Sequence, residues 1–393
     1  MFPRKIYPSL KGHLGKKQVT VLTGLRRTGK TTLVKALLAE IKSSNKLYLD
    51  LQVLANQDLF YNRDFEAIVE NLRLRGLDFD KKVYLAIDEI QIVKELPGIV
   101  KYIYDNYSVK FILIGSSSYY IKNLFNESLA GRKKIFELKP LDFEEFLGFK
   151  KIKFIKRDLG EAIFNESEYT RLRKYYDEYV AFGGFPEVVL ARAKKDKQDL
   201  LDDIISSYVN IDIATLDDFD NRQNVYNLLK LLASRAGSRV DYSKLSSISG
   251  LNRHKIKEYL ELFASTYLIY LVSVKGRSAD REIVKAKKLY FADSGLLSVL
   301  AEVSSGVKFE NAVYNQLASL GEIKYFALKS GQEIDYILDN QIALEAKETP
   351  TEIDWKTLAN LSKKAGLSKF YLVGKNQAPE FRDFLWAGNI YGN

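Results

Sequence analysis

The feature that most constrains this chain is a glycine-rich turn between a strand and a helix near its N-terminus. Val19–Thr23 is an apolar run typical of a buried strand, and it leads directly into Gly24–Thr31, which reads Gly-Leu-Arg-Arg-Thr-Gly-Lys-Thr. Apolar residues then recur at the spacing of one helix face, at Leu33, Ala36, Leu37 and Ile41. In this context the pattern G-x-x-x-x-G-K-[ST] predicts a phosphate-binding loop.

Each residue type in this loop suits phosphate binding. Gly24 permits the tight turn, and Gly29 lets backbone N–H groups approach an anion without an intervening Cβ. Lys30 neutralises β- and γ-phosphate oxygens, the Thr31 hydroxyl is a magnesium ligand, and the helix that begins near Lys30 adds its positive dipole end. We therefore expect ATP and Mg²⁺ as cofactors. The expected nucleotide-binding residues in the loop are Gly24, Arg27, Thr28, Gly29, Lys30, Thr31 and Thr32.

A second predicted strand, which ends in two acidic residues, supplies the remaining parts of a hydrolytic site. The apolar run Val83–Ile87 is followed by Asp88 and Glu89. Asp88 is expected to hold the magnesium bound by Thr31, directly or through water, and Glu89 to polarise the attacking water.

Two further segments are candidates for the γ-phosphate. Phe111–Ile114 predicts a third strand, and ligands of open α/β sheets lie beyond the carboxyl ends of strands, so Ser116 or Ser117 is a candidate contact. A generic serine-rich loop is the alternative. Arg132 is a candidate γ-phosphate sensor or finger, acting in cis or in a neighbouring copy, and an exposed helix-end arginine is the alternative.

Composition narrows the remaining chemistry. The 393 residues include no cysteine and only His13 and His254, which excludes disulfides and Cys-type zinc sites and disfavours a histidine metal centre. Any metal should be a hard ion held by oxygens. No apolar run approaches the roughly 18 residues of a membrane span, and no signal-peptide pattern follows Met1. We expect a cytoplasmic protein without membrane contact.

Together the motifs resemble those of AAA+-superfamily ATPases of archaea and bacteria that carry a C-terminal nuclease-fold domain. The resemblance covers nearly the whole chain. It implies a parallel sheet of about five strands, in which the phosphate loop's strand lies between the strand before Ser116 and the strand after Arg132, with a helical lid over the nucleotide. The matching segments are Gly24–Thr31, Ile87–Gln91, Gly115–Ser117, Leu129–Arg132, Leu138–Phe146, Tyr179–Glu187 and Asp293–Leu296.

The middle of the chain combines a helical bundle with a basic segment. Residues 141–214 have mainly helical spacing, broken at Gly183–Gly184, which favours a turn, with a hinge as the alternative. Residues 222–291 carry 14 Lys+Arg and 5 Asp+Glu, a local +9 in a chain of +10. Three helices and two strands are expected there, the order of a winged helix-turn-helix. We expect this segment to contact DNA, and protein interaction is the alternative.

The last hundred residues contain a second candidate site. Ile334–Leu338 and Ile342–Lys347 predict a hairpin in which Asp335 lies opposite Glu345, and Lys347 shares the face of Glu345. Glu310 can join from a preceding helix. The set Glu310, Asp335, Glu345 and Lys347 resembles the PD-(D/E)xK nuclease motif without its proline, which implies a second magnesium site. An edge hairpin with an exposed ion pair is the alternative.

These patterns predict an α/β chain with a parallel-sheet P-loop core of the AAA+ type, a helical lid, a winged helix and a C-terminal α/β nuclease-like domain. The expected domains are residues 1–140, 141–214, 215–295 and 296–393. The favoured function is an ATPase whose nucleotide state controls a DNA-binding C-terminal half. The alternatives are an ATP-gated, magnesium-dependent DNA nuclease and a non-enzymatic nucleotide switch that recruits protein partners. The oligomeric state stays open.

Overall fold

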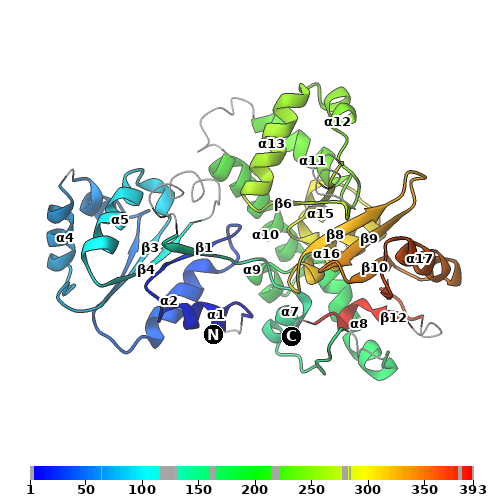
Figure 1. Ribbon diagram of the computed structural model, residues 1–393, viewed down its shortest axis with the longest axis horizontal. Coiled ribbons are helices and arrows are strands. Elements are labelled where there is room, and N and C mark those ends of the chain that lie inside the picture. Colours follow the sequence, from blue (N-terminus) through cyan, green and yellow to red (C-terminus); the bar gives the residue numbers. More distant parts are fainter. Residues whose placement is uncertain are drawn as a thin grey trace. The chain divides into compact units, whose positions relative to one another are not determined.

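In a computed structural model, the chain folds into two compact units (Figure 1). The first comprises residues 1–139 with 265–267, and the second comprises the remaining residues from 140 onward. The structure describes residues 4–62, 64–115, 129, 131–159, 164–213, 222–276, 282, 285–378 and 383–391. Within these ranges no helix is both long and apolar enough to cross a membrane.

The first unit is built on a five-stranded sheet in which every neighbouring pair is parallel. The strand order is β2-β3-β4-β1-β5, so the strand before the phosphate loop lies between the strand before Ser116 and the strand after Arg132, which confirms that prediction. The strands are β1 Val19–Thr23, β2 Lys46–Asp50, β3 Val83–Asp88, β4 Val109–Ile114 and β5 Lys133–Glu137.

Helices cover both faces of this sheet, which explains why its strands are nearly continuous apolar runs. Side chains of α4 and α5 form the core on one face, and side chains of α1 and α2 form the core on the other (Figure 1). The helical elements are α1 Tyr7–His13, α2 Lys30–Glu40, α3 Leu54–Gln57, η1 Asp58–Phe60, α4 Phe65–Leu74, η2 Ile90–Ile92 and α5 Leu96–Asn106.

The second unit begins with helices and ends with a mixed sheet of order β12-β11-β10-β9-β8. Its helices are α7 Phe143–Phe149, α8 Glu166–Phe182, α9 Pro186–Leu190, α10 Lys194–Ser207, η3 Tyr208–Ile213, α11 Arg222–Ala233, α12 Tyr242–Ser249, α13 Arg253–Ser265, α15 Ser294–Leu300, α16 Ser305–Leu317, α17 Glu352–Lys364 and η4 Ala387–Asn389. Its strands are β6 Ile269–Val272, β7 Lys288–Phe291, β8 Ile323–Ala327, β9 Glu333–Leu338, β10 Ile342–Lys347, β11 Lys369–Gly374 and β12 Phe384–Trp386.

The segments expected as lid, winged helix and nuclease-like domain are joined closely in this second unit. α8 packs against both α15 and α16, and the side-chain amide of Gln316 on α16 donates to Tyr176 Oη on α8 at 3.0 Å. Asn311 on α16 accepts from the backbone N–H of Phe291 in β7 at 2.8 Å. The described helices between residues 143 and 213 are therefore part of the second compact unit.

A close backbone junction connects α8 with the start of α15. Gly183 ends α8 with φ of 73°, and the N–H of Gly184 donates to the buried carboxylate of Asp293 at 2.6 Å. Gly184 also accepts from the Leu141 N–H at 2.7 Å. Gly183–Gly184 is thus a tightly packed turn, as the favoured sequence interpretation has it.

This junction predicts a large stability loss for Gly184→Ala. An added Cβ would lie 2.0 Å from the carbonyl oxygen of Leu141, so the backbone must move and its hydrogen bonds weaken. Overpacking of this kind costs about 1–3 kcal/mol, and the contact with a backbone atom places Gly184→Ala at the upper end of this range. Gly12→Ala is the matched control, because a Cβ on this helical residue meets nothing within 4 Å. Urea unfolding monitored by circular dichroism should separate the two variants, and equal midpoints would contradict the packing described.

Candidate nucleotide site and a carboxylate cluster

The phosphate loop has the backbone conformation that its glycines were expected to permit. Gly24 has φ of 133°, and a Cβ placed on it would lie 2.3 Å from the carbonyl oxygen of Leu138. Gly29 has φ of 92° and caps the N-terminus of α2. Both positions lie in a region of backbone space that side chains other than glycine rarely adopt. The loop therefore runs directly from the carboxyl end of β1 into the first turn of α2.

Lys30, Thr31 and Asp88 meet at the carboxyl edge of the sheet. The buried Lys30 ammonium donates to the carbonyl oxygens of Gly24 at 2.7 Å and Leu25 at 2.8 Å. The Thr31 hydroxyl donates to Asp88 Oδ2 at 2.7 Å. The two parts of the site, which are 57 residues apart in the chain, are thus in direct contact.

Glu89 follows Asp88 in an unusual backbone conformation. Its φ of 53° is left-handed, its N–H donates to Asp88 Oδ1 at 2.9 Å, and its carboxylate accepts from Gln91 Nε2 at 2.5 Å. Arg26 Nη1 lies 3.8 Å from the same carboxylate. A strained non-glycine residue that persists at such a position is typical of functional sites. The strain aims the Glu89 side chain at the loop that carries Arg26.

Two residues that the sequence reasoning did not single out help to form this site. Tyr48 on β2 donates its hydroxyl to Asp88 Oδ2 at 2.8 Å, so the carboxylate that meets Thr31 is held from a second strand. Arg4 donates to the carbonyl oxygens of Thr28 at 2.9 Å and Lys139 at 2.7 Å, which fixes the phosphate loop. In the sequence, Tyr48 could have been recognised as a site residue because its hydroxyl is the polar group in the otherwise apolar segment Leu47–Leu49.

The residues of this site are suited to bind magnesium and a nucleoside triphosphate. The N-terminus of α2 and the loop N–H groups offer donors to phosphate oxygens, and the Lys30 ammonium can exchange its loop carbonyls for them. Thr31 and Asp88 offer the hydroxyl and carboxylate oxygens that Mg²⁺ prefers. Arg27 and Thr28 lie in the same loop, and Thr32 is exposed on the first turn of α2.

The structure places Arg132 away from this loop. Arg132 directly precedes β5, and its carbonyl oxygen accepts from the N–H of Val19 at the start of β1. Because β1 and β5 are parallel, Arg132 lies at the amino edge, about 15 Å along the strands from the phosphate loop. Its Nε lies 3.2 Å from Asp105. A cis role at its own phosphate loop is therefore a wrong prediction. Ser116 and Ser117 lie outside the described residues.

The C-terminal hairpin has the predicted register. Leu338 pairs with Ile342 and Tyr336 with Leu344, so Asp335 is opposite Glu345, whose carboxylate accepts from the Asp335 N–H at 3.1 Å. Lys347 Nζ lies 2.8 Å from Glu345. Asp339 and Asn340 both have left-handed backbone conformations in the connecting turn. The expected carboxylates and lysine are therefore neighbours on this hairpin.

A buried lysine from β7 occupies the centre of this cluster. The Lys288 side chain is 1% exposed, and its ammonium lies 2.8 Å from Asp335, 2.9 Å from Glu333 and 3.6 Å from Glu310. Asp335 Oδ1 accepts a hydrogen bond from it. Burial would lower the pKa of Lys288, but the three carboxylates outweigh burial and raise it. Lys288 is therefore a buried counter-ion that three carboxylates of the cluster share.

The remaining acids are perturbed in a way that reflects their crowding. Burial and the Asp335 charge raise the pKa of Glu310 to about 7 and that of Glu345 to about 8. Burial opposes ionisation of Asp335, but Lys288 and Lys347 lower its pKa overall. Among the described residues no group of three or more acidic or histidine side chains could hold a metal ion. The second magnesium site expected at Glu310, Asp335 and Glu345 does not fit this arrangement, because an ammonium stands among the carboxylates.

The basic segment presents part of its charge on α13. Ile256, Leu260 and Phe263 are buried, whereas Arg253 and Lys257 are exposed near the helix N-terminus. Glu258 and Glu261 lie on the same helix, and Lys257 Nζ is 3.8 Å from Glu261. β6 and β7 form an antiparallel pair after this helix, as expected. Arg277 and Arg281, in the connection between these strands, lie outside the described residues.

Comparison with known proteins agrees with the geometry of the first unit. Residues 16–147 match the family described as an AAA domain. This match supports a P-loop ATPase of the AAA type. The segment that matches the AAA domain contains the phosphate loop, Asp88 and Glu89. Residues 173–306 match a second family, described as a domain of unknown function, DUF8612.

The full-length relatives are uncharacterised proteins. One from Methanocaldococcus jannaschii, MJ1544, is 25% identical over 86% of this chain and 77% of its own length. One from Haemophilus influenzae is 26% identical over 86% of this chain and 85% of its own length. Among solved structures, Aeropyrum pernix ORC1 in complex with DNA is 13% identical with a TM-score of 0.32, covering 75% of this chain and 90% of that one.

Proposed function

We propose that this chain hydrolyses ATP with Mg²⁺ in its AAA-like unit and that its nucleotide state controls DNA binding by the C-terminal half. The observation that carries the proposal is the direct contact of Thr31 with Asp88 beside the Lys30 ammonium. These three groups come from the two strand ends at which P-loop ATPases hold phosphate and magnesium.

Each residue then has a distinct role. Lys30 neutralises phosphate oxygens, and Thr31 and Asp88 would hold a magnesium ion, which would stabilise the charge of the transferred phosphoryl group. Glu89 accepts a proton from the attacking water, and Gln91, which donates to its carboxylate, orients it. Arg26 forms an ion pair with the Glu89 carboxylate at 3.8 Å, which links this carboxylate to the phosphate loop.

The DNA-binding part of the proposal rests on charge and on element order. Three helices followed by an antiparallel strand pair span residues 222–291, which carry the local charge of +9. This order is that of a winged helix, whose third helix enters the major groove with its N-terminal residues at the base edges. Arg253 and Lys257 are exposed at the corresponding end of α13.

We propose that the C-terminal sheet belongs to a nuclease-like fold that binds DNA without cleaving it. The register of Asp335 and Glu345 supports the nuclease resemblance, but the Lys288 ammonium lies 2.8 Å from Asp335 and competes with a metal ion for its carboxylate. Magnesium-dependent cleavage of single-stranded, duplex or branched DNA, lost in Asp335→Asn, would contradict this view.

Duplex DNA binding tests the DNA-binding part directly. Binding should weaken steeply with salt, because each neutralised phosphate releases counterions. The double variant Arg253→Ala with Lys257→Ala should bind at least about tenfold more weakly and lower the log–log salt slope by about 2. The double variant Lys194→Ala with Lys195→Ala removes the same charge from an exposed turn of α10 and should match the parent. Fluorescence anisotropy at several salt concentrations measures both quantities, and a flat salt response would contradict DNA binding.

A further inference from the structure

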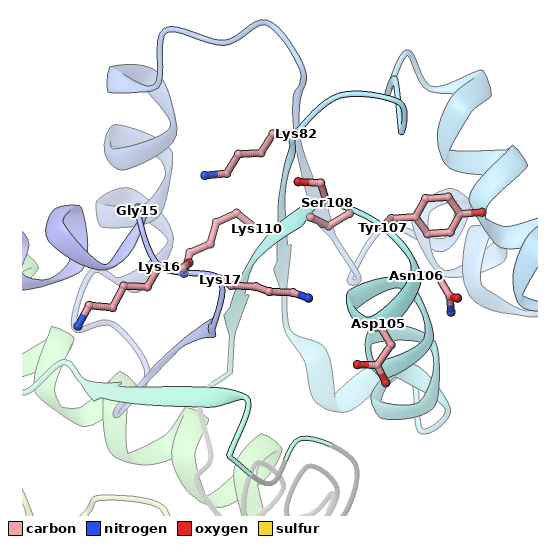
Figure 2. Close-up of a pocket in the computed structure, with 10 residues that line it drawn as sticks. Gly15, Lys16, Lys17, Lys82, Asp105, Asn106, Tyr107, Ser108 and Lys110 are labelled. Atoms are coloured by element: carbon pink, nitrogen blue, oxygen red, sulfur yellow. The ribbon is translucent and has the colours of Figure 1, made fainter.

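A pocket of about 490 Å³ in the first unit has a strongly basic lining (Figure 2). Lys16 and Lys17 precede β1, Lys82 precedes β3, and Lys110 lies at the start of β4. Since the strands are parallel, these residues gather at the amino edge of the sheet, whereas the phosphate loop follows the opposite edge. The pocket is therefore separate from the candidate nucleotide site.

The positive charge of this pocket has no internal counter-charge. Its one acidic lining residue, Asp105, has its carboxylate 3.2 Å from Arg132, so that charge is already paired. Within the described part of the chain, none of the four lysines is in an ion pair. Because Arg132 already balances Asp105, the four lysines leave a charge of +4 around a single hollow. Clefts of one sign concentrate ligands of the opposite sign.

Neighbouring groups hold these lysines in place without neutralising them. Lys110 is 1% exposed, and its ammonium donates to the carbonyl oxygens of Lys16 at 3.0 Å and Gln18 at 2.5 Å, which fixes the segment before β1. Lys17 Nζ lies 4.8 Å from the Tyr104 ring centre, and Lys82 Nζ lies 5.0 Å from that of Tyr84. Such cation–π contacts orient an ammonium and leave its charge in place.

Burial, together with smaller contributions from like charges, lowers the pKa of two groups at this pocket. Burial, with a smaller contribution from the Lys82 charge, lowers the pKa of Lys110 to about 8. Burial and the Lys110 charge also lower the pKa of His13, and Lys16 adds to this effect. An anion bound in the pocket would offset this repulsion.

We propose that this pocket binds a ligand through two or more phosphate groups. Lysine ammonium groups are compact point charges that suit the tetrahedral oxygens of phosphate, whereas planar carboxylates favour arginine. One phosphate would leave part of the +4 charge uncompensated. The volume lies in the range of small-molecule sites, and the half-open lining also admits adjacent phosphates of a nucleic acid.

Calorimetry with tripolyphosphate tests the pocket on the full-length chain. The experiment uses a Lys30→Ala parent, so that the phosphate loop does not contribute. Adding Lys17→Gln and Lys82→Gln should raise the Kd for tripolyphosphate at least tenfold, and both side chains are exposed, so folding should be retained. Adding Lys81→Gln and Lys94→Gln, which removes the same charge from exposed residues outside the lining, should leave the Kd unchanged. Equal affinity in the two sets, or no binding by the parent at low salt, would overturn the proposal.

A competition experiment then distinguishes the two sources of phosphate. If the natural ligand is a nucleic acid, a short DNA duplex should displace tripolyphosphate from the protein. The affinity of the protein for this duplex should then fall in the pocket variant but not in the control variant. If the ligand is a free polyphosphate compound, duplex affinity should be the same in both, while tripolyphosphate still discriminates between them. Displacement of tripolyphosphate to the same extent by sulfate at equal ionic strength would overturn the requirement for several phosphates.

Discussion

Replacing Lys30 with alanine is expected to lower kcat/KM for ATP by at least about 100-fold, the size of effect seen when one preorganised electrostatic contact to a reacting group is lost. Lys30 supplies the positive charge beside the loop carbonyls of Gly24 and Leu25, and the described loop offers no second lysine. A coupled assay of phosphate release, with nucleotide affinity from a fluorescent ATP analogue, measures the two effects separately.

Glu89→Gln serves as the companion variant because it keeps the shape of the side chain. It should bind ATP like the parent and turn over at least about 100-fold more slowly, since the amide cannot accept the proton of the attacking water. Lys101→Ala, which removes an exposed lysine from helix α5, should be close to the parent in both measurements. Parent-like turnover in Glu89→Gln would contradict the role given to this carboxylate.

Lys288→Met is expected to destabilise the second unit by about 3–5 kcal/mol, the usual cost of removing one partner from a buried ion pair. Methionine retains much of the volume of the side chain but leaves Glu310, Glu333 and Asp335 without their shared cation. Urea unfolding followed by tyrosine and tryptophan fluorescence measures the change.

Lys347→Met is the matched control, because its side chain is 40% exposed and meets one carboxylate, so its loss should cost about 1 kcal/mol or less. Combining Lys288→Met with Asp335→Asn should recover part of the lost stability, since the substitution removes one unpaired charge. Strong stabilisation of the nucleotide-free wild-type protein by Mn²⁺ would contradict the view of Lys288 as counter-ion, provided that the stabilisation is lost in Asp335→Asn.

The parts of the fold that depend on local pattern were predictable from sequence. The phosphate loop, the strand that ends at Asp88 and the hairpin with Asp335 opposite Glu345 each follow from periodicity and turn chemistry within a few dozen residues. The position of β1 between β4 and β5 followed from the family resemblance.

The parts that depend on contacts between distant segments were not predictable. Lys288 lies 47 residues before Asp335, and in the sequence it is one of several lysines in a basic stretch, so nothing marked it as buried. Arg132 was placed near the γ-phosphate by its motif, but parallel pairing of β5 with β1 puts it at the other edge. The packing of α8 against α15 and α16 likewise joins segments that are distant in the sequence, so no local pattern indicated it.

The rate of ATP turnover with and without duplex DNA tests most directly whether nucleotide chemistry and DNA binding are linked in this chain. Wild-type protein should hydrolyse ATP on its own, and saturating duplex DNA should change that rate at least about threefold, with the response lost in the variant that lacks Arg253 and Lys257 on α13. A turnover rate that is the same at every DNA concentration, in protein shown to bind the DNA, would contradict the proposed control of DNA binding by nucleotide state.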